Sequence, residues 1–275
     1  MGRARMSDAV VSVKGLELRF GDRKLWDSLD FDLAPGELLA VLGPNGTGKT
    51  SLIRILLGLL APTAGTVEIE GAPAGERRDR IGYIPQQRVF DRDLRIRGRD
   101  LVRFGLDGHR YGAGKLDPAG EAAIARVLDE VGATALADAP VGRLSGGEQQ
   151  RLRVAQALVG DPSLLLADEP LLSLDLAYQR VIVNLLDARR RDGTPVVFVT
   201  HDVNPVLPIV DRVLYLAPGA WAIGPPHGVM TSETLSRLYG TEVDVLEVRG
   251  RIVVVGTPDD QHVHHVDEDG HGHTH

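Results

Sequence analysis

The sequence of 275 residues contains no cysteine, and only 4% of its residues are aromatic. Without cysteine the chain has no disulfide, no thiolate metal site and no cysteine nucleophile, which fits a reducing compartment. With so few aromatic residues, the core must be built mainly from leucine, valine, isoleucine and alanine. The net charge of −7 argues against a general nucleic-acid binder, because such proteins present a basic face.

Long hydrophobic runs are missing as well. No apolar run approaches the roughly 20 residues that span a bilayer. The beginning of the chain, MGRARMSDAVV, lacks the apolar segment of a secretory signal. The sequence therefore predicts a protein of the cytoplasm, either in solution or attached to another component.

Strand-like and helix-like segments alternate along the chain. Apolar runs such as residues 37–43 and 163–168 are typical of buried strands, whereas residues 10–20 alternate like a half-buried strand. This alternation predicts an α/β fold with a parallel central sheet. We expect helices over 49–60, 94–106, 119–138, 147–162, 178–193 and 232–240, the last capped by Thr231 or Ser232. We expect further strands over 24–37, 65–71, 80–86, 195–202, 212–224 (a hairpin), 243–250 and 251–256.

The segment GPNGTGKT, residues 43–50, matches the phosphate-loop pattern G-x-x-x-x-G-K-[ST] at every fixed position. A predicted strand precedes it and a predicted helix follows it. The glycines allow several backbone N–H groups to point at one anion, and the helix adds the positive end of its dipole. Lys49 can reach the β- and γ-phosphates and the Thr50 hydroxyl can bind Mg²⁺. The alternative is a glycine-rich turn with an incidental lysine, which the surrounding strand and helix disfavour.

The segment LLLADE, residues 164–169, is an apolar strand that ends in two carboxylates. We expect Asp168 to hold Mg²⁺ together with Thr50. Glu169 is then placed to polarise a water for in-line attack on the γ-phosphate. A solvated acidic turn is the alternative, and the phosphate loop upstream favours the catalytic interpretation.

The segment LSGGEQQR, residues 144–151, precedes that strand and opens a helix. Ser145, two glycines and a helix N-terminus form a second anion-binding surface, which one chain does not need for one nucleotide. With these motifs in this order, the chain resembles the ATP-binding subunit of an ABC transporter over about residues 10–240. Residues 144–151 resemble the signature motif of that family.

Other positions resemble further motifs of the family. Gln86 stands where the Q-loop glutamine falls, although Gln87 beside it leaves this assignment ambiguous. Residues 172–175, LSLD, resemble the D-loop. After the proline of DEPLLSLD, residues 168–175, the chain carries leucines where many relatives carry threonine and serine. His201 resembles the switch histidine that touches the γ-phosphate. Phe20 takes the place of the aromatic residue that stacks on adenine.

The resemblance implies a P-loop NTPase core with a parallel-sheet centre, an N-terminal antiparallel β-subdomain and a helical insertion. We expect this ABC ATPase domain over residues 10–240, with the helical subdomain over about 88–160. The remaining sequence predicts a small C-terminal β appendage over 241–258. A tail rich in histidine and acidic residues, predicted to be disordered, follows over 259–275.

The resemblance also implies that two copies enclose two ATP molecules, so that each site contains residues of both. The nucleotide-binding residues would be Phe20, Gly43, Pro44, Asn45, Gly46, Thr47, Gly48, Lys49, Thr50 and Ser51. The catalytic residues would be Lys49, Gln86, Glu169 and His201. The Mg²⁺ ligands would be Thr50, Gln86 and Asp168. The second copy would contribute Ser145, Gly146, Gly147, Glu148 and Asp175.

The resemblance implies membrane permease subunits as partners, at the cytoplasmic face of the cell membrane, and a solute-binding protein reached only through them. Six arginines lie between Arg88 and Arg103. They form either a solvated helical face or the surface that docks on the permease. Nucleic-acid binding by this strip is disfavoured by the net charge and the lack of interleaved aromatic residues.

Three kinds of function fit these motifs: an importer subunit, a soluble ABC ATPase of DNA repair or of ribosomes, and a binding module without turnover. The full catalytic set disfavours the last, and the single core with a compact insertion favours the importer. Residues 200–216, THDVNPVLPIVDRVLYL, resemble importers for zinc and manganese. Iron complexes or another small solute are the alternatives.

The chain ends in HVHHVDEDGHGHTH, residues 262–275, which holds six of its nine histidines. An engineered handle is usually an unbroken histidine run, and this one is interrupted. Imidazoles and carboxylates suit Zn²⁺ or Mn²⁺. The tail is therefore either a cytoplasmic metal buffer or sensor, or a solvated segment without a role. Its candidate ligands are His262, His264, His265, His271, His273 and His275.

Overall fold

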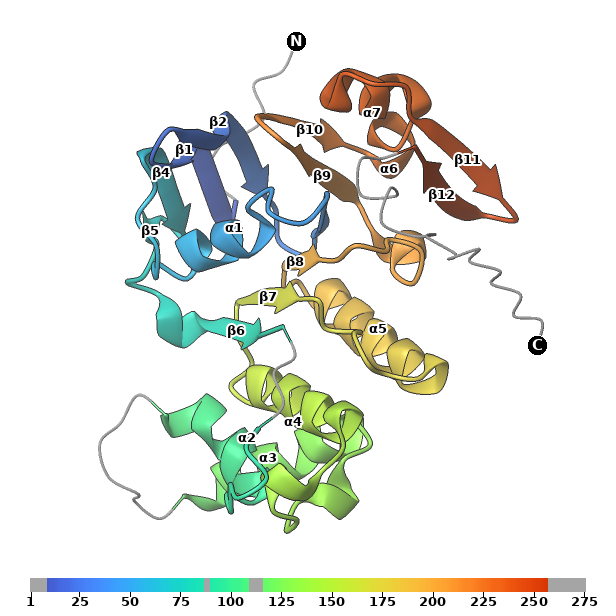
Figure 1. The fold of residues 1–275 in the computed structure, drawn as a ribbon. Coiled ribbons are helices and arrows are strands. Elements are labelled where there is room, and N and C mark those ends of the chain that lie inside the picture. The colour runs from blue at the N-terminus through green and yellow to red at the C-terminus, as the bar shows by residue number, and fades with distance from the viewer. Residues whose placement is uncertain (1–8, 87–89, 109–115, 257–275) are drawn as a thin grey trace, which may run out of the picture.

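A six-stranded sheet forms the centre of the computed structural model, which describes residues 9–86, 90–108 and 116–256 (Figure 1). Its strand order is β10-β9-β3-β8-β7-β6, and every neighbouring pair is parallel except β9 with β10. The strands are β3 (Leu38–Leu42), β6 (Ile81–Ile84), β7 (Leu164–Asp168), β8 (Val196–Val199), β9 (Arg212–Ala217) and β10 (Ala220–Gly224). All residues of β3, β7 and β8 are buried, which explains their uninterrupted apolar sequences.

An antiparallel sheet lies beside the central one, in the order β2-β1-β4-β5. Its strands are β1 (Val11–Phe20), β2 (Arg23–Leu33), β4 (Ala64–Ile69) and β5 (Ala72–Pro73). Helix α1 (Lys49–Leu56) contributes apolar side chains to the same hydrophobic core as this sheet. The expected fold class is confirmed by these two sheets and by the group of helices between β6 and β7.

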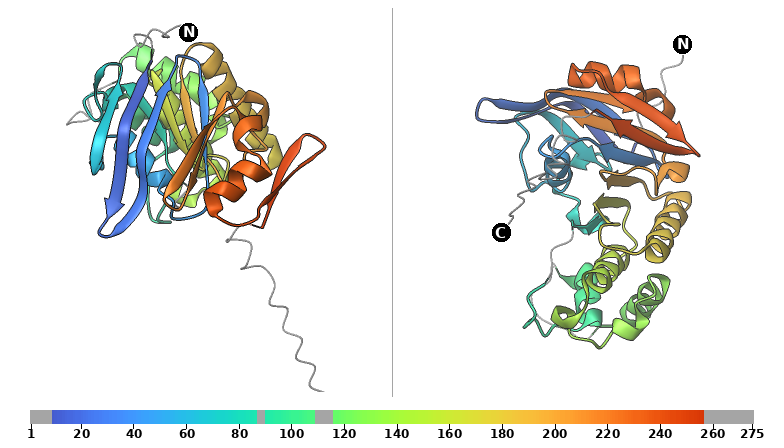
Figure 2. Two further views of the ribbon diagram at one scale, coloured as in Figure 1. Left: turned by 90° about the horizontal axis from the view of Figure 1, so that it is seen from above. Right: turned by 45° about the vertical axis from the view of Figure 1, so that its right-hand side comes forward.

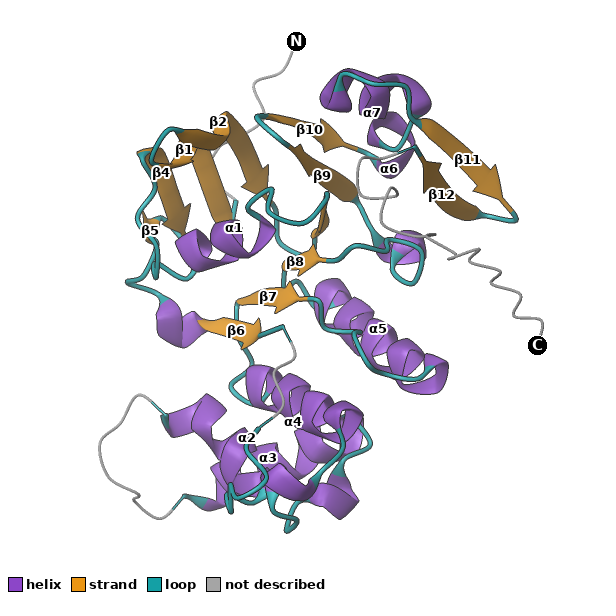
Figure 3. Cartoon of the chain, viewed as in Figure 1, coloured by secondary structure: helices purple, strands orange, loops and turns teal. Residues whose placement is uncertain are grey.

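That group of helices consists of α2 (Gly98–Asp107), α3 (Pro118–Glu130) and α4 (Gly146–Leu158). Helices α2 and α3 pack on α4, and α4 packs on β6. Figure 3 shows them together at one end of the molecule, away from the antiparallel sheet. Helix α5 (Leu176–Arg191) follows β7. Single 3-10 turns lie at Arg78–Arg80, Thr134–Leu136, Val141–Arg143 and Leu207–Ile209.

The C-terminal part contains α6 (Pro226–Val229), α7 (Ser232–Tyr239) and a hairpin of β11 (Asp244–Val248) and β12 (Arg251–Val255). The hairpin lies beside α7 on the side of the molecule away from β5 (Figures 1 and 2). One of its faces packs on the main core through Val245, Ile252 and Val254. Of the two expected caps of α7, Thr231 is the one that caps the helix, because its side chain accepts from the Thr234 amide, whereas the Ser232 hydroxyl accepts from the Val245 amide of β11.

The sequence predictions were wrong at element boundaries: the helix expected over 119–138 ends at Glu130, and the strand expected over 24–37 ends at Leu33. Helix α1 was expected to reach residue 60 and ends at Leu56. The cause is Gly58, whose φ is 64° and whose added Cβ would lie 2.4 Å from the Gly75 Cα. The backbone turns at Gly58, where Gly75 packs close against it. The sequence around Gly58 does not predict this contact. Across the residues that the structure describes, no helix is long and apolar enough to cross a membrane.

Candidate functional site

The loop between β3 and α1 depends on glycines at two close contacts. A Cβ on Gly43, whose φ is 135°, would lie 2.0 Å from the backbone oxygen of Leu216 on β9. A Cβ on Gly48, whose φ is 97°, would lie 2.7 Å from Trp26 Nε1. Trp26 is fully buried and its Nε1 donates to the Thr47 carbonyl at 3.1 Å. Strand β2 thus holds the loop in position from behind.

Lys49 begins α1 and turns its ammonium back over the loop. Its Nζ donates to the carbonyl oxygens of Gly43 at 2.5 Å and Pro44 at 2.9 Å. The Thr47 hydroxyl also donates to the Pro44 carbonyl, at 2.9 Å. Lys49 is only 8% exposed, so its charge is largely withdrawn from bulk water, at the helix end that attracts anions. The loop is therefore already shaped for a negatively charged group.

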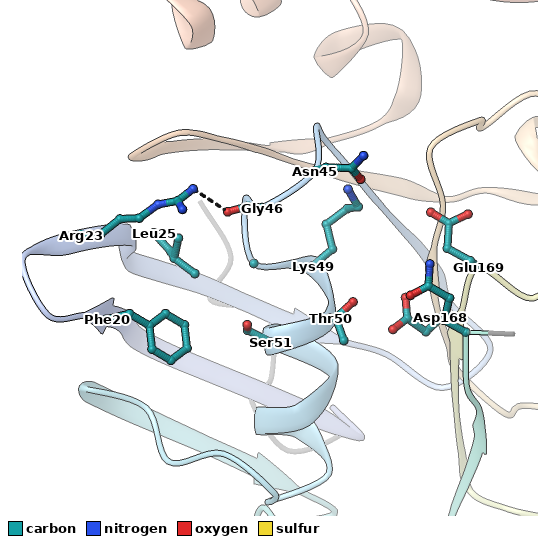
Figure 4. A pocket seen from close by; sticks show the side chains of 12 residues that line it. Phe20, Arg23, Leu25, Asn45, Gly46, Lys49, Thr50, Ser51, Asp168 and Glu169 are labelled. Atoms are coloured by element: carbon teal, nitrogen blue, oxygen red, sulfur yellow. Dashed lines mark hydrogen bonds between the residues drawn. The ribbon is translucent and has the colours of Figure 1, made fainter. Parts of the chain in front are cut away.

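A cavity of about 360 Å³ opens over this loop (Figure 4). The exposed ring of Phe20 lies at one end of it, and Asp168 and Glu169 lie at the other. A planar apolar ring at one end and charged groups at the other suit a nucleotide base and its phosphates. The predicted residues that line this cavity are Phe20, Asn45, Gly46, Gly48, Lys49, Thr50, Ser51, Gln86, Asp168 and Glu169. Gly43, Pro44 and Thr47 shape the loop but do not line the cavity.

Two lining residues were not predicted. Arg23 donates from Nη2 to the Gly46 carbonyl at 3.0 Å, and Leu25 lines the same cavity (Figure 4). Both come from β2, where the alternating pattern distinguishes only inward from outward positions. No motif separates them from the other residues of that strand.

Asp168, at the end of β7, is 1% exposed. Burial raises the pKa of its carboxyl, and a hydrogen bond with Thr50 opposes that shift. Within the described residues its Oδ2 has no hydrogen-bond partner. A buried carboxylate with an unused oxygen next to a hydroxyl offers the hard oxygen ligands that Mg²⁺ prefers. The residues present therefore fit a Mg²⁺ ion bound with a nucleotide.

Glu169 and His201 are paired at the same edge of the sheet. His201 Nδ1 lies 2.8 Å from Glu169 Oε2, although the two residues follow different strands, β7 and β8. The Glu169 amide donates to the Val199 carbonyl at 3.0 Å, which ties both strand ends together. The Glu169 side chain is 13% exposed and that of His201 is 66% exposed. A carboxylate held by an imidazole at the mouth of a phosphate cavity can orient or deprotonate a water.

Residues of the signature segment, 144–151, line a second cavity of about 790 Å³. Ser145 and Glu148 form a capping box at the start of α4, and these hydrogen bonds from Ser145 lower the pKa of Glu148. The Asp175 side chain caps α5 by accepting from the Tyr178 amide at 2.9 Å. The structure thus gathers Ser145, Gly146, Gly147, Glu148 and Asp175 in one place, and none of them lines the first cavity.

Sequence reasoning also missed two buried glutamines of α4. The Gln149 side chain accepts from the Phe90 amide at 3.0 Å and donates to the Leu144 carbonyl at 3.0 Å. The Gln150 side chain donates to the Pro170 carbonyl at 3.2 Å. Helix α4 is thereby linked to the segment after Gln86 and to the residue after Glu169. As polar residues, Gln149 and Gln150 are expected from the sequence to lie on a solvated face of the helix. In the structure both are buried and hydrogen-bonded to backbone groups.

A phosphate-binding loop between a buried parallel strand and a helix, with carboxylates at the end of another strand of the sheet, defines an α/β nucleotide-binding protein of the P-loop class. The model of the ABC transporter family matches residues 26–172, and the chain belongs to this family. The expected enzyme class, an ATPase, is confirmed by this membership.

Two relatives show the range of this similarity. The zinc import ATP-binding protein ZnuC of Pseudomonas putida is 33% identical over 273 residues, which cover 94% of this chain and 97% of the relative. The Nod factor export ATP-binding protein I of Burkholderia orbicola is 34% identical, over 89% of this chain and 78% of the relative. Relatives with different solutes in their names are thus about equally similar to this chain.

Solved structures are similar in the same way. A provisionally assigned metal-chelate type ABC transporter in an inward-facing conformation superposes with a TM-score of 0.74 at 29% identity, over 90% of this chain and 96% of the other. A dimeric, post-hydrolysis ATP-binding cassette bound to ADP and phosphate gives a TM-score of 0.66 at 27% identity, over 77% of this chain and 97% of the other.

Proposed function

We propose that the chain is the ATP-hydrolysing, energy-coupling subunit of an importer for a divalent metal ion, Zn²⁺ or Mn²⁺, bound to permease subunits at the cytoplasmic face of the cell membrane. The observation that carries this proposal is the cavity lined by the phosphate loop, Asp168 and Glu169, together with the contact between Glu169 and His201, which does not itself line the cavity. The zinc-import and metal-chelate names of similar proteins support the choice of a metal ion.

In the proposed reaction, Lys49 and the loop amides bind the β- and γ-phosphates of ATP, and Phe20 stacks on the base. Glu169 accepts a proton from, or orients, the water that attacks the γ-phosphate in line, and His201 holds Glu169 and approaches that phosphate. Thr50, Asp168 and Gln86 would hold Mg²⁺, which supplies positive charge to the phosphate oxygens.

We further propose that the second cavity completes the site of another copy. Ser145, Gly146, Gly147, Glu148 and Asp175 then contact the ATP held on the phosphate loop of the partner. The separation of the two cavities within one chain, and the dimeric state of a similar ATP-binding cassette, support this arrangement. Because each site needs both copies, hydrolysis is coupled to closing and opening of the dimer.

The helical group α2–α4 is the proposed docking surface for the permease. Part of the arginine strip is neutralised locally, since Arg99 pairs with Asp138 at 3.0 Å and Arg103 with Asp107 at 2.8 Å. The exposed ring of Phe104 on α2 gives this surface an apolar element. The Gln149 side chain links α4 to the Phe90 amide, four residues after Gln86 in the sequence.

The solute is tested by the ATPase activity of the complex assembled with its membrane subunits and solute-binding protein. We expect Zn²⁺ or Mn²⁺ to raise this activity, because the transported solute favours the closed ATPase dimer. The matched comparison is the same complex with a ferric chelate. If only the ferric chelate stimulates ATP hydrolysis, the protein is the subunit of an iron-complex importer instead. If the ATPase activity of the chain is the same with and without the membrane subunits, the result favours a soluble ABC ATPase.

The histidine-rich tail, with its candidate ligands, lies outside the described residues, and its role as a metal buffer or sensor stays a proposal. We expect deletion of residues 262–275 to lower the amount of Zn²⁺ bound per chain, measured by equilibrium dialysis, and to leave basal ATPase activity intact. A His227→Ala variant, which removes a lone histidine on α6, is the control and should bind as much Zn²⁺ as the full chain. Unchanged Zn²⁺ binding after the deletion would refute the proposal.

A further inference from the structure

The loop that carries His201 is held by a short series of hydrogen bonds beginning at the end of β8. The Thr200 hydroxyl donates to the Asp202 carbonyl at 2.9 Å and accepts from the Asp202 amide at 3.1 Å. The Asp202 carboxylate in turn accepts from the backbone amide of Asn204 at 2.9 Å and from its side chain at 2.8 Å. His201 therefore sits between two residues whose positions are fixed by their neighbours.

The Asn204 side chain also reaches the C-terminal hairpin. Its Nδ2 donates to the Ile252 carbonyl at 2.9 Å, and its Oδ1 accepts from the Ile252 amide at 2.8 Å. A side-chain amide has a donor and an acceptor spaced like those of a peptide group, so this pair of bonds imitates one residue of a paired strand. The two segments are separated by 48 residues in sequence.

The hairpin register explains why Ile252 is available for this contact. Arg249 and Gly250, with φ of 52° and 73°, form the two-residue turn, and the pair Val248–Arg251 closes it. The next pair, Glu247–Ile252, is then a non-hydrogen-bonded pair of the ladder. The amide and carbonyl of Ile252 point outward from β12, and Asn204 occupies that edge.

We propose that Asn204 is a positioning residue for His201. Asn204 couples the C-terminal hairpin to the loop at the nucleotide site. The coupling runs from Ile252 through the Asn204 amide to Asp202 and the backbone on either side of His201. The hairpin cannot shift along β12 without breaking both bonds to Asn204 or moving the loop. The inference rests on the proposed role of His201 in ATP hydrolysis and gives the C-terminal hairpin a function in that reaction.

A simpler role for Asn204 is to anchor the hairpin without any effect on His201. The hairpin has another polar anchor that allows the two roles to be separated. The Ser236 hydroxyl on α7 accepts from the Val243 amide at 2.9 Å and donates to the Val243 carbonyl at 3.2 Å. This anchor also consists of two hydrogen bonds to one backbone residue, but it does not touch residues 200–204.

The test compares Asn204→Ala with Ser236→Ala in the full chain. We expect Asn204→Ala to lower kcat for ATP about three- to tenfold and to leave KM for ATP within about twofold, because the phosphate loop is untouched. Ser236→Ala should lose similar thermal stability and keep the kcat of the wild type. Hydrogen exchange of the Ile252 amide, which donates to Asn204, should accelerate in Asn204→Ala.

An unchanged kcat in Asn204→Ala, or an equal fall in Ser236→Ala, would overturn the inference. If Asn204→Ala does not fold, Asn204→Asp replaces it, since the carboxylate keeps the acceptor for the Ile252 amide and loses the donor to its carbonyl. A wild-type kcat in that variant would also overturn it. Absence of ATPase activity in the wild-type chain and its assembled complex would instead refute the proposed function.

Discussion

Replacing Glu169 with glutamine is expected to lower kcat for ATP by at least about a hundredfold while ATP still binds. Glutamine has the shape of glutamate and keeps an oxygen that can meet His201 Nδ1, now 2.8 Å from Glu169 Oε2. It cannot accept a proton from water at neutral pH. The phosphate loop is shaped by its own hydrogen bonds, among them that of Lys49 to the Gly43 carbonyl, and should bind ATP as before.

The measurement is steady-state ATPase activity together with ATP affinity by a fluorescent analogue. Because hydrolysis reopens the proposed dimer, Glu169→Gln should also accumulate as an ATP-bound dimer, visible by size-exclusion chromatography with multi-angle scattering. Glu68→Gln, at an exposed position of β4 outside both cavities, is the control and should hydrolyse ATP normally. Hydrolysis at the wild-type rate by Glu169→Gln would show that another group activates the water.

The sequence predicted those parts of the site that follow buried strands of the central sheet. The residues Gly43, Asp168, His201 and Gln86 come at or just after the ends of β3, β7, β8 and β6. The carboxyl ends of parallel strands share one edge of a sheet, so short apolar runs ending in functional residues predict a common site. The pairing of His201 with Glu169 follows from the adjacency of β7 and β8, which the sequence does not state.

The residues that the sequence did not reveal act through partners distant in the chain. Arg23 reaches the Gly46 carbonyl, Gln149 reaches Phe90 and Asn204 reaches Ile252. Each is a polar residue whose local pattern predicts exposure, and only the tertiary fold supplies its buried or backbone partner. Helix ends were missed for a related reason, since α1 stops where the backbones of Gly58 and Gly75 meet.

Replacing Lys49 with alanine is expected to weaken ATP binding about tenfold to hundredfold, since one charge-assisted contact to phosphate is lost. In the structure the ammonium already has acceptors, the carbonyls of Gly43 and Pro44. Phosphate oxygens are negatively charged and are stronger acceptors than carbonyl oxygens. The hydrogen bonds of the lysine therefore become stronger when ATP binds and phosphate replaces the carbonyls. Turnover should fall as well, because the same charge lies near the transferred γ-phosphate.

This result would separate the two charged groups of the cavity: Lys49→Ala changes the dissociation constant for ATP, whereas Glu169→Gln changes kcat alone. Titration calorimetry with ATP and Mg²⁺ measures the first quantity. The matched control is Lys24→Ala, because Lys24 lies on β2, forms an ion pair with Asp27 and does not line the cavity. That variant should bind ATP like the wild type. Equal ATP affinities in the wild type, Lys49→Ala and Lys24→Ala would mean that the backbone amides and the start of α1, rather than the ammonium, provide the affinity for phosphate.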